Sequence, residues 1–314
     1  FQKKYPEINV VVVSGRGSQL RQKMLSENRA GKVIADVVTT GARTNYQALH
    51  ANNLIDPIKP VLMLPEVVDE SLWFEGKHRY IDPERQYILV YMGNVARTAS
   101  YNTKLLDPKT IKSYWDFLRP EFKGKILARD IRQGGSGGDA IRFMYHNPQI
   151  GPKFIERLFS ETDLTITRSN RQGLDWLGVG RYQIGLFFGR VQMARSQGLP
   201  LDELDPHLFK EGAPLGIGPG SIALMRNAPH PNAAKVYINW YLSREGQKVV
   251  QRVIAQAGSG GDSMRIDIPK EDIPPEYRRK KGAEYMFVAT PEYTDMYPIY
   301  KIINKALAMK GKMK

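Results

Sequence analysis

Apolar residues recur along the chain with two spacings, which predict alternating strands and helices. Short β-branched and aromatic runs predict strands over residues 8–13, 33–39, 87–91, 125–128, 164–167, 182–188 and 222–226, and an extended crossing segment over 99–102. Apolar residues three and four positions apart predict helices over 19–30, 44–53, 113–118, 140–146, 152–159, 172–179, 231–242, 243–257 and 299–309. This alternation favours an α/β fold with parallel sheets.

Three loops share one feature: each leaves the carboxyl end of a predicted strand and enters a helix through small or hydroxyl residues. They cover Ser14–Ser18, Arg132–Asp139 and Arg168–Arg171. Ligands of open α/β sheets bind outside the carboxyl ends of the strands, and backbone N–H groups at helix N-termini favour anions. The loops therefore indicate a ligand cleft, although glycine and serine in such loops also serve simply to make tight turns.

Composition narrows the chemistry further. The 314 residues include no cysteine, which excludes zinc fingers, iron–sulfur clusters and thiol nucleophiles and suits an oxidising compartment. No apolar run approaches the roughly 18–20 residues that span a bilayer. The formal net charge is +14, but the positive residues are spread along the chain and cluster only at 278–281 and near the C-terminus. A solvated surface or small-anion binding explains this charge better than nucleic-acid binding, which would need a basic stripe with interleaved aromatic residues.

Enzyme motifs are absent. The segment Gly15–Leu20 lacks the third glycine of a dinucleotide-binding loop, and Gly134–Asp139 lacks the Gly-Lys-Ser/Thr of a phosphate loop. The five histidines are scattered, without metal-ligand spacing. We therefore expect no catalytic residues, no cofactor and no metal site.

Several segments together resemble a known family. They are the opening Phe1–Val10, the strand Ala35–Val38, the crossover with Tyr101–Leu105, Ser113–Leu118 and Phe122–Ile126, and the return through Gly220–Leu224, Ala228–Lys235 and Ser243–Gln247. This order is similar to that of the periplasmic substrate-binding proteins of ABC importers, of the type 2 periplasmic binding protein fold, in the group that includes ferric-ion-binding proteins. The resemblance covers about residues 1–260.

The resemblance implies two α/β lobes with a ligand cleft at the hinge. Lobe 1 is expected over 1–97 and 212–265, lobe 2 over 98–211, and a C-terminal helical extension over 266–314. The chain is expected to be a periplasmic monomer that closes around a small-molecule ligand, delivers it to an ABC permease in the inner membrane, and binds no nucleic acid. The candidate ligand residues are Ser14, Arg16, Gly17, Ser18, Thr39, Thr40, Arg43, Arg132, Ser136, Gly137, Arg168, Ser169, Arg171, Phe187 and Phe188.

Two departures from the family pattern change the expected start and ligand. The family opens with a strand and helix before the segment seen here, so the first βα unit is expected to be missing. Ferric-binding members use a Tyr-Tyr pair where this chain has Phe187-Phe188, and no acidic residue follows the strand that ends at Thr39. Because bare Fe³⁺ needs hard anionic oxygens, we expect a polar or anionic organic ligand or an anionic metal chelate. The alternatives are a ferric-ion-binding transport protein and an enzyme on a similar two-lobe fold.

Overall fold

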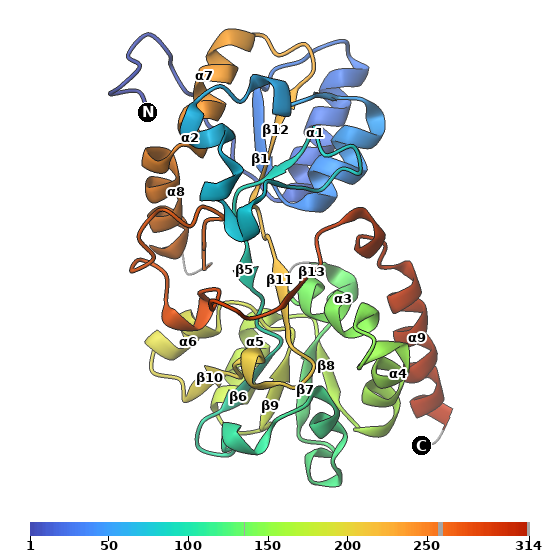
Figure 1. Ribbon diagram of the computed structural model, residues 1–314. Helices are drawn as coiled ribbons and strands as arrows, with labels where there is room; N and C mark the ends of the chain where they lie inside the picture. The colour runs from blue at the N-terminus through green and yellow to red at the C-terminus, as the bar shows by residue number, and fades with distance from the viewer. Residues whose placement is uncertain (135, 257–259, 313–314) are drawn as a thin grey trace. The chain divides into compact units, whose positions relative to one another are not determined.

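The chain folds into two units, each assembled from segments that are distant in the sequence. The structure is a computed structural model that describes residues 1–134, 136–256 and 260–312. Unit 1 comprises Phe1–Asn94, Ile217–Arg278 and Ala289–Pro291; unit 2 comprises Val95–Gly216, Arg279–Val288 and Glu292–Lys314. Both units combine helices with a five-stranded sheet (Figure 1).

The sheet of unit 1 is built around β12 (Ser221–Met225), whose five residues are all buried. On one side β12 pairs with β1 (Val37–Thr40). On its other side the first part of β12 pairs with β4 (Leu89–Val90) and its last part with β2 (Ile55–Asp56). Strand β4 in turn pairs with β3 (Arg79–Tyr80). Every one of these pairs is antiparallel. The expected all-parallel sheet is therefore wrong for unit 1, because the returning strand β12 lies between β1 and β4 and runs opposite to both.

Three helices of unit 1 follow the predicted positions with small shifts: α1 (Gly17–Arg29), α7 (Pro231–Leu242) and α8 (Arg244–Gln256). The one-turn helix α2 (Pro65–Val68) was not predicted. Where a helix was predicted over 44–53, the chain forms a π-helix over Arg43–Leu49 and a 3₁₀ turn over His50–Asn52. Further 3₁₀ turns cover Lys59–Val61, Glu70–Leu72, Phe74–Gly76 and Pro275–Tyr277.

The sheet of unit 2 is mixed, and its parallel part positions the candidate site. Its order is β10 (Leu201–Glu203), β6 (Ala99–Asn102), β9 (Ile184–Leu186), β7 (Ile126–Arg129) and β8 (Thr165–Thr167). Strand β7 runs parallel to both β8 and β9, whereas β6 runs antiparallel to β9 and β10. The carboxyl ends of β7, β8 and β9 therefore meet at one edge of the sheet.

Helices α3 (Gly138–His146), α5 (Asn170–Gly178) and α6 (Val191–Ser196) follow β7, β8 and β9 respectively. Helix α4 (Gly151–Glu161) packs against the C-terminal helix α9 (Tyr297–Lys312), as Figure 1 shows. Short 3₁₀ turns cover Pro108–Thr110, Tyr114–Leu118, Pro120–Phe122, Ile131–Gln133, Pro206–Leu208 and Pro291–Tyr293. A small sheet pairs β11 (Ala213–Gly216) in parallel with β13 (Tyr285–Phe287), and β5 (Asn94–Val95) completes it.

The predicted strand over residues 8–13 is wrong. Residues 8–16 form no regular element, and the side chains of Val11, Val12 and Val13 are 78%, 76% and 58% exposed. A β-branched run becomes a strand only where a neighbour offers backbone partners and a surface to pack on. Within the described chain, β1 pairs with β12 alone, and no strand pairs with residues 8–13.

Candidate functional site

Three segments of unit 1 converge at the carboxyl end of β1, and we call them the unit 1 loops: residues 14–18, 39–44 and 218–220. The hydroxyl of Thr44 donates to the carbonyl oxygen of Gly17 at 3.3 Å. A Cβ atom on Gly41 would lie 2.8 Å from the carbonyl oxygen of Gly218, so only glycine permits this approach. The hydroxyl of Ser221 donates to the carbonyl oxygen of Thr40 at 2.6 Å, which ties β12 to the same loops.

The predicted site residues of unit 1 differ in exposure. Ser14, Arg16, Ser18 and Thr39 are exposed and Gly17 is half-buried, whereas Thr40 is buried. The side chain of Arg43 lies outside the described part of the structure. The unit 1 loops therefore present hydroxyl groups, a guanidinium group and the N-terminus of α1 to solvent.

Unit 2 brings together the loops that follow β7, β8 and β9, and we call them the unit 2 loops: residues 130–134, 136–139, 168–171 and 187–190. The hydroxyl of Ser136 donates to the carbonyl oxygen of Phe187 at 2.9 Å. The side-chain amide of Asn170 donates to the carbonyl oxygen of Gly189 and accepts from its N–H, both at 2.9 Å. These bonds cross-link the loops, so the structure unites two of the three predicted loops and adds the one after β9.

The two phenylalanines after β9 point inward. Phe187 and Phe188 are 1% and 7% exposed and belong to two different hydrophobic clusters of unit 2. Stacking on a ligand would require either ring to leave the core, so that predicted contact stays without structural support. The two rings instead hold the loop after β9 in place by packing in the hydrophobic core of unit 2.

The arginines in and beside the unit 2 loops fall into two groups. Nε and Nη2 of Arg132 donate to the two carboxylate oxygens of Asp130 at 2.7 and 3.0 Å, and Arg142 forms an ion pair with Asp139. The hydrogen bond from Arg132 is the main cause that holds the pKa of Asp130 below its usual value. Both carboxylates of these loops are therefore matched by arginines of the same segment.

The second group is exposed and comprises Arg168, Arg171 and Arg190. Arg168 follows β8, and Arg171 lies in the first turn of α5, whose N-cap Ser169 accepts a hydrogen bond from the N–H of Gln172 at 3.2 Å. Arg190 was not predicted as a site residue, although its position between β9 and α6 follows the same strand–loop–helix pattern as the other loops. Exposed guanidinium groups beside a helix N-terminus attract anions.

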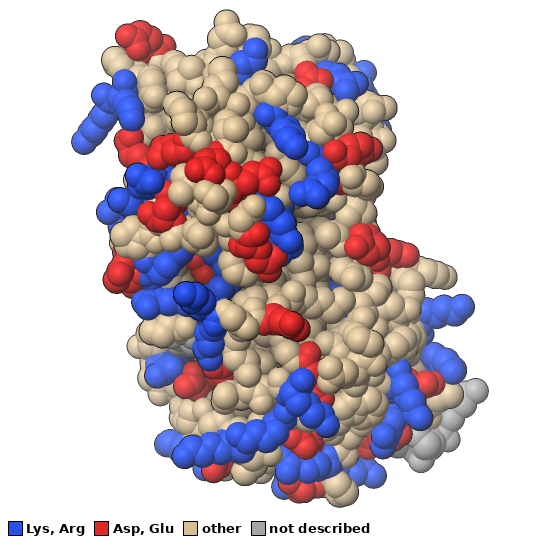
Figure 2. Space-filling model, in the orientation of Figure 1, with Lys and Arg blue, Asp and Glu red and all other residues tan. Residues whose placement is uncertain are grey.

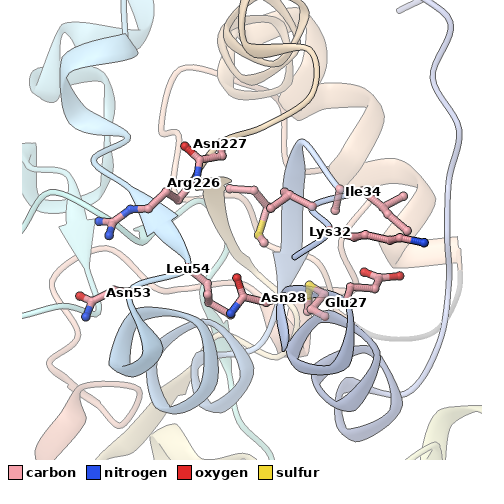
Figure 3. A pocket seen from close by; sticks show the side chains of 12 residues that line it. Glu27, Asn28, Lys32, Ile34, Asn53, Leu54, Arg226 and Asn227 are labelled. Atoms are coloured by element: carbon pink, nitrogen blue, oxygen red, sulfur yellow. The ribbon is translucent and has the colours of Figure 1, made fainter. Parts of the chain in front are cut away.

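A hollow lies elsewhere in unit 1 (Figure 3). Its lining includes Glu27, Asn28, Lys32, Leu54 and Arg226. Lys32 precedes β1 and Arg226 follows the antiparallel β12, so the hollow lies at the opposite end of these strands from the unit 1 loops. It is separate from the candidate site.

The described residues contain no group of three or more histidine, aspartate or glutamate side chains arranged to hold a metal ion. Nor does any helix in this part of the chain have the length and apolar character needed to cross a membrane. On the face shown in Figure 2, basic side chains are interspersed with acidic ones and do not form one continuous stripe.

Comparison with known proteins identifies the family. The model of the family described as "Bacterial extracellular solute-binding protein" matches residues 1–248. The spermidine/putrescine-binding periplasmic protein of Escherichia coli (strain K12) is 26% identical over 179 residues, which are 55% of this chain and 49% of that protein. The match thus spans about half the length of this curated relative.

Solved structures of the same fold align over nearly the whole chain. The periplasmic binding protein AfuA from Actinobacillus pleuropneumoniae, with fructose-6-phosphate bound, is 16% identical, with a TM-score of 0.63 and coverage of 99% of this chain and 92% of AfuA. Iron-bound HitA from Pseudomonas aeruginosa is 18% identical, with a TM-score of 0.61 and the same coverage of each chain. These likenesses confirm the predicted two-lobe periplasmic binding protein fold, and the family is one of binding proteins rather than enzymes. The chain belongs to the bacterial extracellular solute-binding protein family.

Proposed function

We propose that the chain is the periplasmic solute-binding component of an ABC importer, and that it binds a small anionic organic solute or an anionic metal chelate. The observation that carries this proposal is the charge balance of the unit 2 loops. Asp130 and Asp139 are both paired with arginines, whereas Arg168, Arg171 and Arg190 are exposed. The surplus charge that these loops present is positive.

This balance argues against a polyamine, the ligand class named for the Escherichia coli relative. A polyamine is a cation and needs carboxylates as partners. The unit 1 loops contain no aspartate or glutamate, and the two carboxylates of the unit 2 loops are already paired. A phosphorylated sugar, such as the one bound to AfuA, or an organic carboxylate suits three guanidinium groups far better.

Ferric ion without a chelating anion is a weaker candidate, although iron-bound HitA shares the fold. Phe187 and Phe188 carry no phenolate oxygen, and both are buried. We expect ferric salt alone to give no charge-transfer colour. A coloured complex would favour a ferric-ion-binding protein and contradict our assignment.

The proposal is tested with a defined set of probes. Native mass spectrometry of the freshly purified protein shows any ligand retained from the cell. Thermal-shift assays then compare fructose 6-phosphate, citrate, ferric citrate, spermidine and ferric salt. We expect at least one anionic probe to raise the melting temperature and spermidine to have no effect.

Single variants locate the binding site. Arg168→Ala and Arg171→Ala each remove a charge-assisted contact, so the affinity for the stabilising anion should fall about tenfold or more. Arg157→Ala is the control, because it removes one arginine charge from unit 2 at a position outside the unit 2 loops. Arg157 is a half-buried residue of α4 that pairs with Glu161 at 2.9 Å. Stabilisation by spermidine alone, or equal losses in the control, would contradict the proposal.

The remaining expectations about the biological setting follow from the same proposal. We expect the protein to act as a monomer, to close around its ligand by a hinge motion and to present the closed form to a membrane permease. We expect no specific binding to nucleic acid. The protein should elute from heparin at moderate salt and show no preference among DNA sequences. Such behaviour indicates a charged surface and not a nucleic-acid-binding site.

A further inference from the structure

The C-terminal helix α9 contacts the loop that follows β7, about 170 residues earlier in the chain. Nη1 of Arg132 donates to Oδ1 of Asn304 at 2.7 Å. The hydroxyl of Tyr300 lies 3.4 Å from the carbonyl oxygen of Ile131. Ile131 is also buried in the same hydrophobic cluster as Ile303 of α9. Helix α9 thus touches the first turn of a unit 2 loop by both polar and apolar contacts.

Arg132 is fixed at its other end as well. Its Nε and Nη2 form a bidentate contact with the carboxylate of Asp130, a residue that is only 5% exposed. Since Nη1 donates to Asn304, all three guanidinium nitrogens have a protein acceptor. This arrangement suits a guanidinium that holds the loop better than one that receives a ligand.

The contact continues to the next loop. The N–H of Asp130 donates to the carbonyl oxygen of Thr167 at 2.8 Å. Thr167 is the last residue of β8 and directly precedes Arg168. The charge of Arg168 also contributes to the lowered pKa of Asp130, so the two groups lie within electrostatic reach. The Arg132–Asp130 pair therefore lies between α9 and the loop that carries Arg168.

Helix α9 is itself a firm support. Its residues Ile299, Ile303 and Ala306 are buried in the unit 2 core. On its exposed side, Nζ of Lys305 lies 3.2 Å from a carboxylate oxygen of Glu156 on α4. A contact to a well-packed helix restrains a loop more strongly than a contact to another loop.

We propose that Arg132 is a positioning residue, and that α9, through Asn304, Arg132 and Asp130, holds the unit 2 loops in the arrangement that presents Arg168 and Ser136. The part of this inference that concerns ligand affinity rests on the proposed function. The part that concerns loop order does not, because it follows from contacts within unit 2. The C-terminal helix thereby belongs to the support of the binding site.

Hydrogen–deuterium exchange on the full chain tests the inference without any ligand. Asn304→Leu removes the acceptor, and we expect amide exchange in peptides covering residues 130–138 to speed up by about three- to tenfold. Asn304→Asp keeps an oxygen acceptor opposite the guanidinium, so exchange should stay at the rate of the unaltered chain or become slower. Lys301→Ala is the control, an exposed position on the same helix.

Unchanged exchange in Asn304→Leu, or equally fast exchange in Asn304→Asp, would overturn the proposal. Citrate and fructose 6-phosphate binding is then measured on the same variants. A weaker affinity in Asn304→Leu that Asn304→Asp restores supports the link to ligand binding, whereas an unchanged affinity despite faster exchange refutes that link. If neither probe binds the unaltered chain, the proposed function fails for these probes, while the exchange result still decides the role of α9.

Discussion

Replacing Gly137 with alanine should destabilise unit 2, whereas the same change at Gly138 should not. Gly137 has φ +88°, in the left-handed region that side chains rarely adopt, and an added Cβ would lie 2.4 Å from Cβ of Phe187. Phe187 itself is buried and has φ +69°, so it has little freedom to move away. A Cβ on the neighbouring Gly138 would meet no atom within 4 Å, and its φ lies outside the left-handed region.

The expected magnitude combines two costs. Holding alanine in the left-handed region costs about 1–2 kcal/mol, and forcing one extra carbon into a packed site costs about 1–3 kcal/mol. Gly137→Ala should therefore lower the local free energy of unfolding by about 2–5 kcal/mol. Gly138→Ala places alanine in the first turn of α3, where the change should be neutral or stabilising by up to about 1 kcal/mol.

Hydrogen exchange measures this effect separately in the two units. Peptides from β7 and α3 should exchange markedly faster in Gly137→Ala, while peptides from α7 in unit 1 serve as the internal reference. Gly138→Ala controls for the loss of a glycine in the same segment. If the two variants exchange alike, the close packing of Gly137 on Phe187 does not exist in solution and the geometry of the unit 2 loops is wrong.

Three further predictions address the valine run, the paired arginine and a buried histidine. Val12→Lys should change the free energy of unfolding by less than about 0.5 kcal/mol, because Val12 is exposed; a loss above about 2 kcal/mol in a urea titration would show that the run is buried after all. Arg132→Ala should destabilise the ligand-free protein by about 1–3 kcal/mol, since it leaves the buried Asp130 without its main partner, whereas Arg168→Ala should leave the unfolding midpoint nearly unchanged. Burial lowers the pKa of His78, so the unfolded chain binds a proton more readily than the folded one, and stability should be lost as the pH falls below about 6.5; His78→Gln should flatten that dependence, and an equal dependence in both proteins would exclude His78 as its source.

The sequence predicted unit 2 better than unit 1 for a physical reason. In unit 2 each strand of the parallel part is followed directly by its helix, so local periodicity was sufficient for β7–α3 and β8–α5. In unit 1 the central strand β12 lies more than 170 residues after β1 in the sequence. The local pattern does not indicate whether β12 runs parallel or antiparallel to β1. The valine run failed for the same reason, because forming a strand depends on a partner that the run itself does not encode.

The candidate site shows the same division between local and distant information. The position of each loop followed from strand–loop–helix order, and this rule would also have found Arg190. Which arginines are paired could be read from the sequence only in part. Asp130 stands two residues before Arg132, whereas Ile166 stands two residues before Arg168, so the pairing of Arg132 had a local signal in the sequence. The second partner of Arg132, Asn304, lies 172 positions beyond it and had none. Likewise, the direction in which Phe187 and Phe188 point depends on core packing.

The sign of the ligand charge must be argued from the loops and not from the net charge. Unit 2 has 26 lysines and arginines against 16 aspartates and glutamates, and unit 1 has 20 against 16, so most of the excess belongs to unit 2. At physiological ionic strength, however, charges are screened beyond about 8 Å, and distant lysines contribute little at the loops. What acts there is the local pairing: a carboxylate held by its own arginine cannot attract a cation, and an exposed arginine can attract an anion. Because this pairing is set by hydrogen-bond geometry, variants of Arg168 and Arg171 should alter anion affinity far more than equal charge changes elsewhere in unit 2.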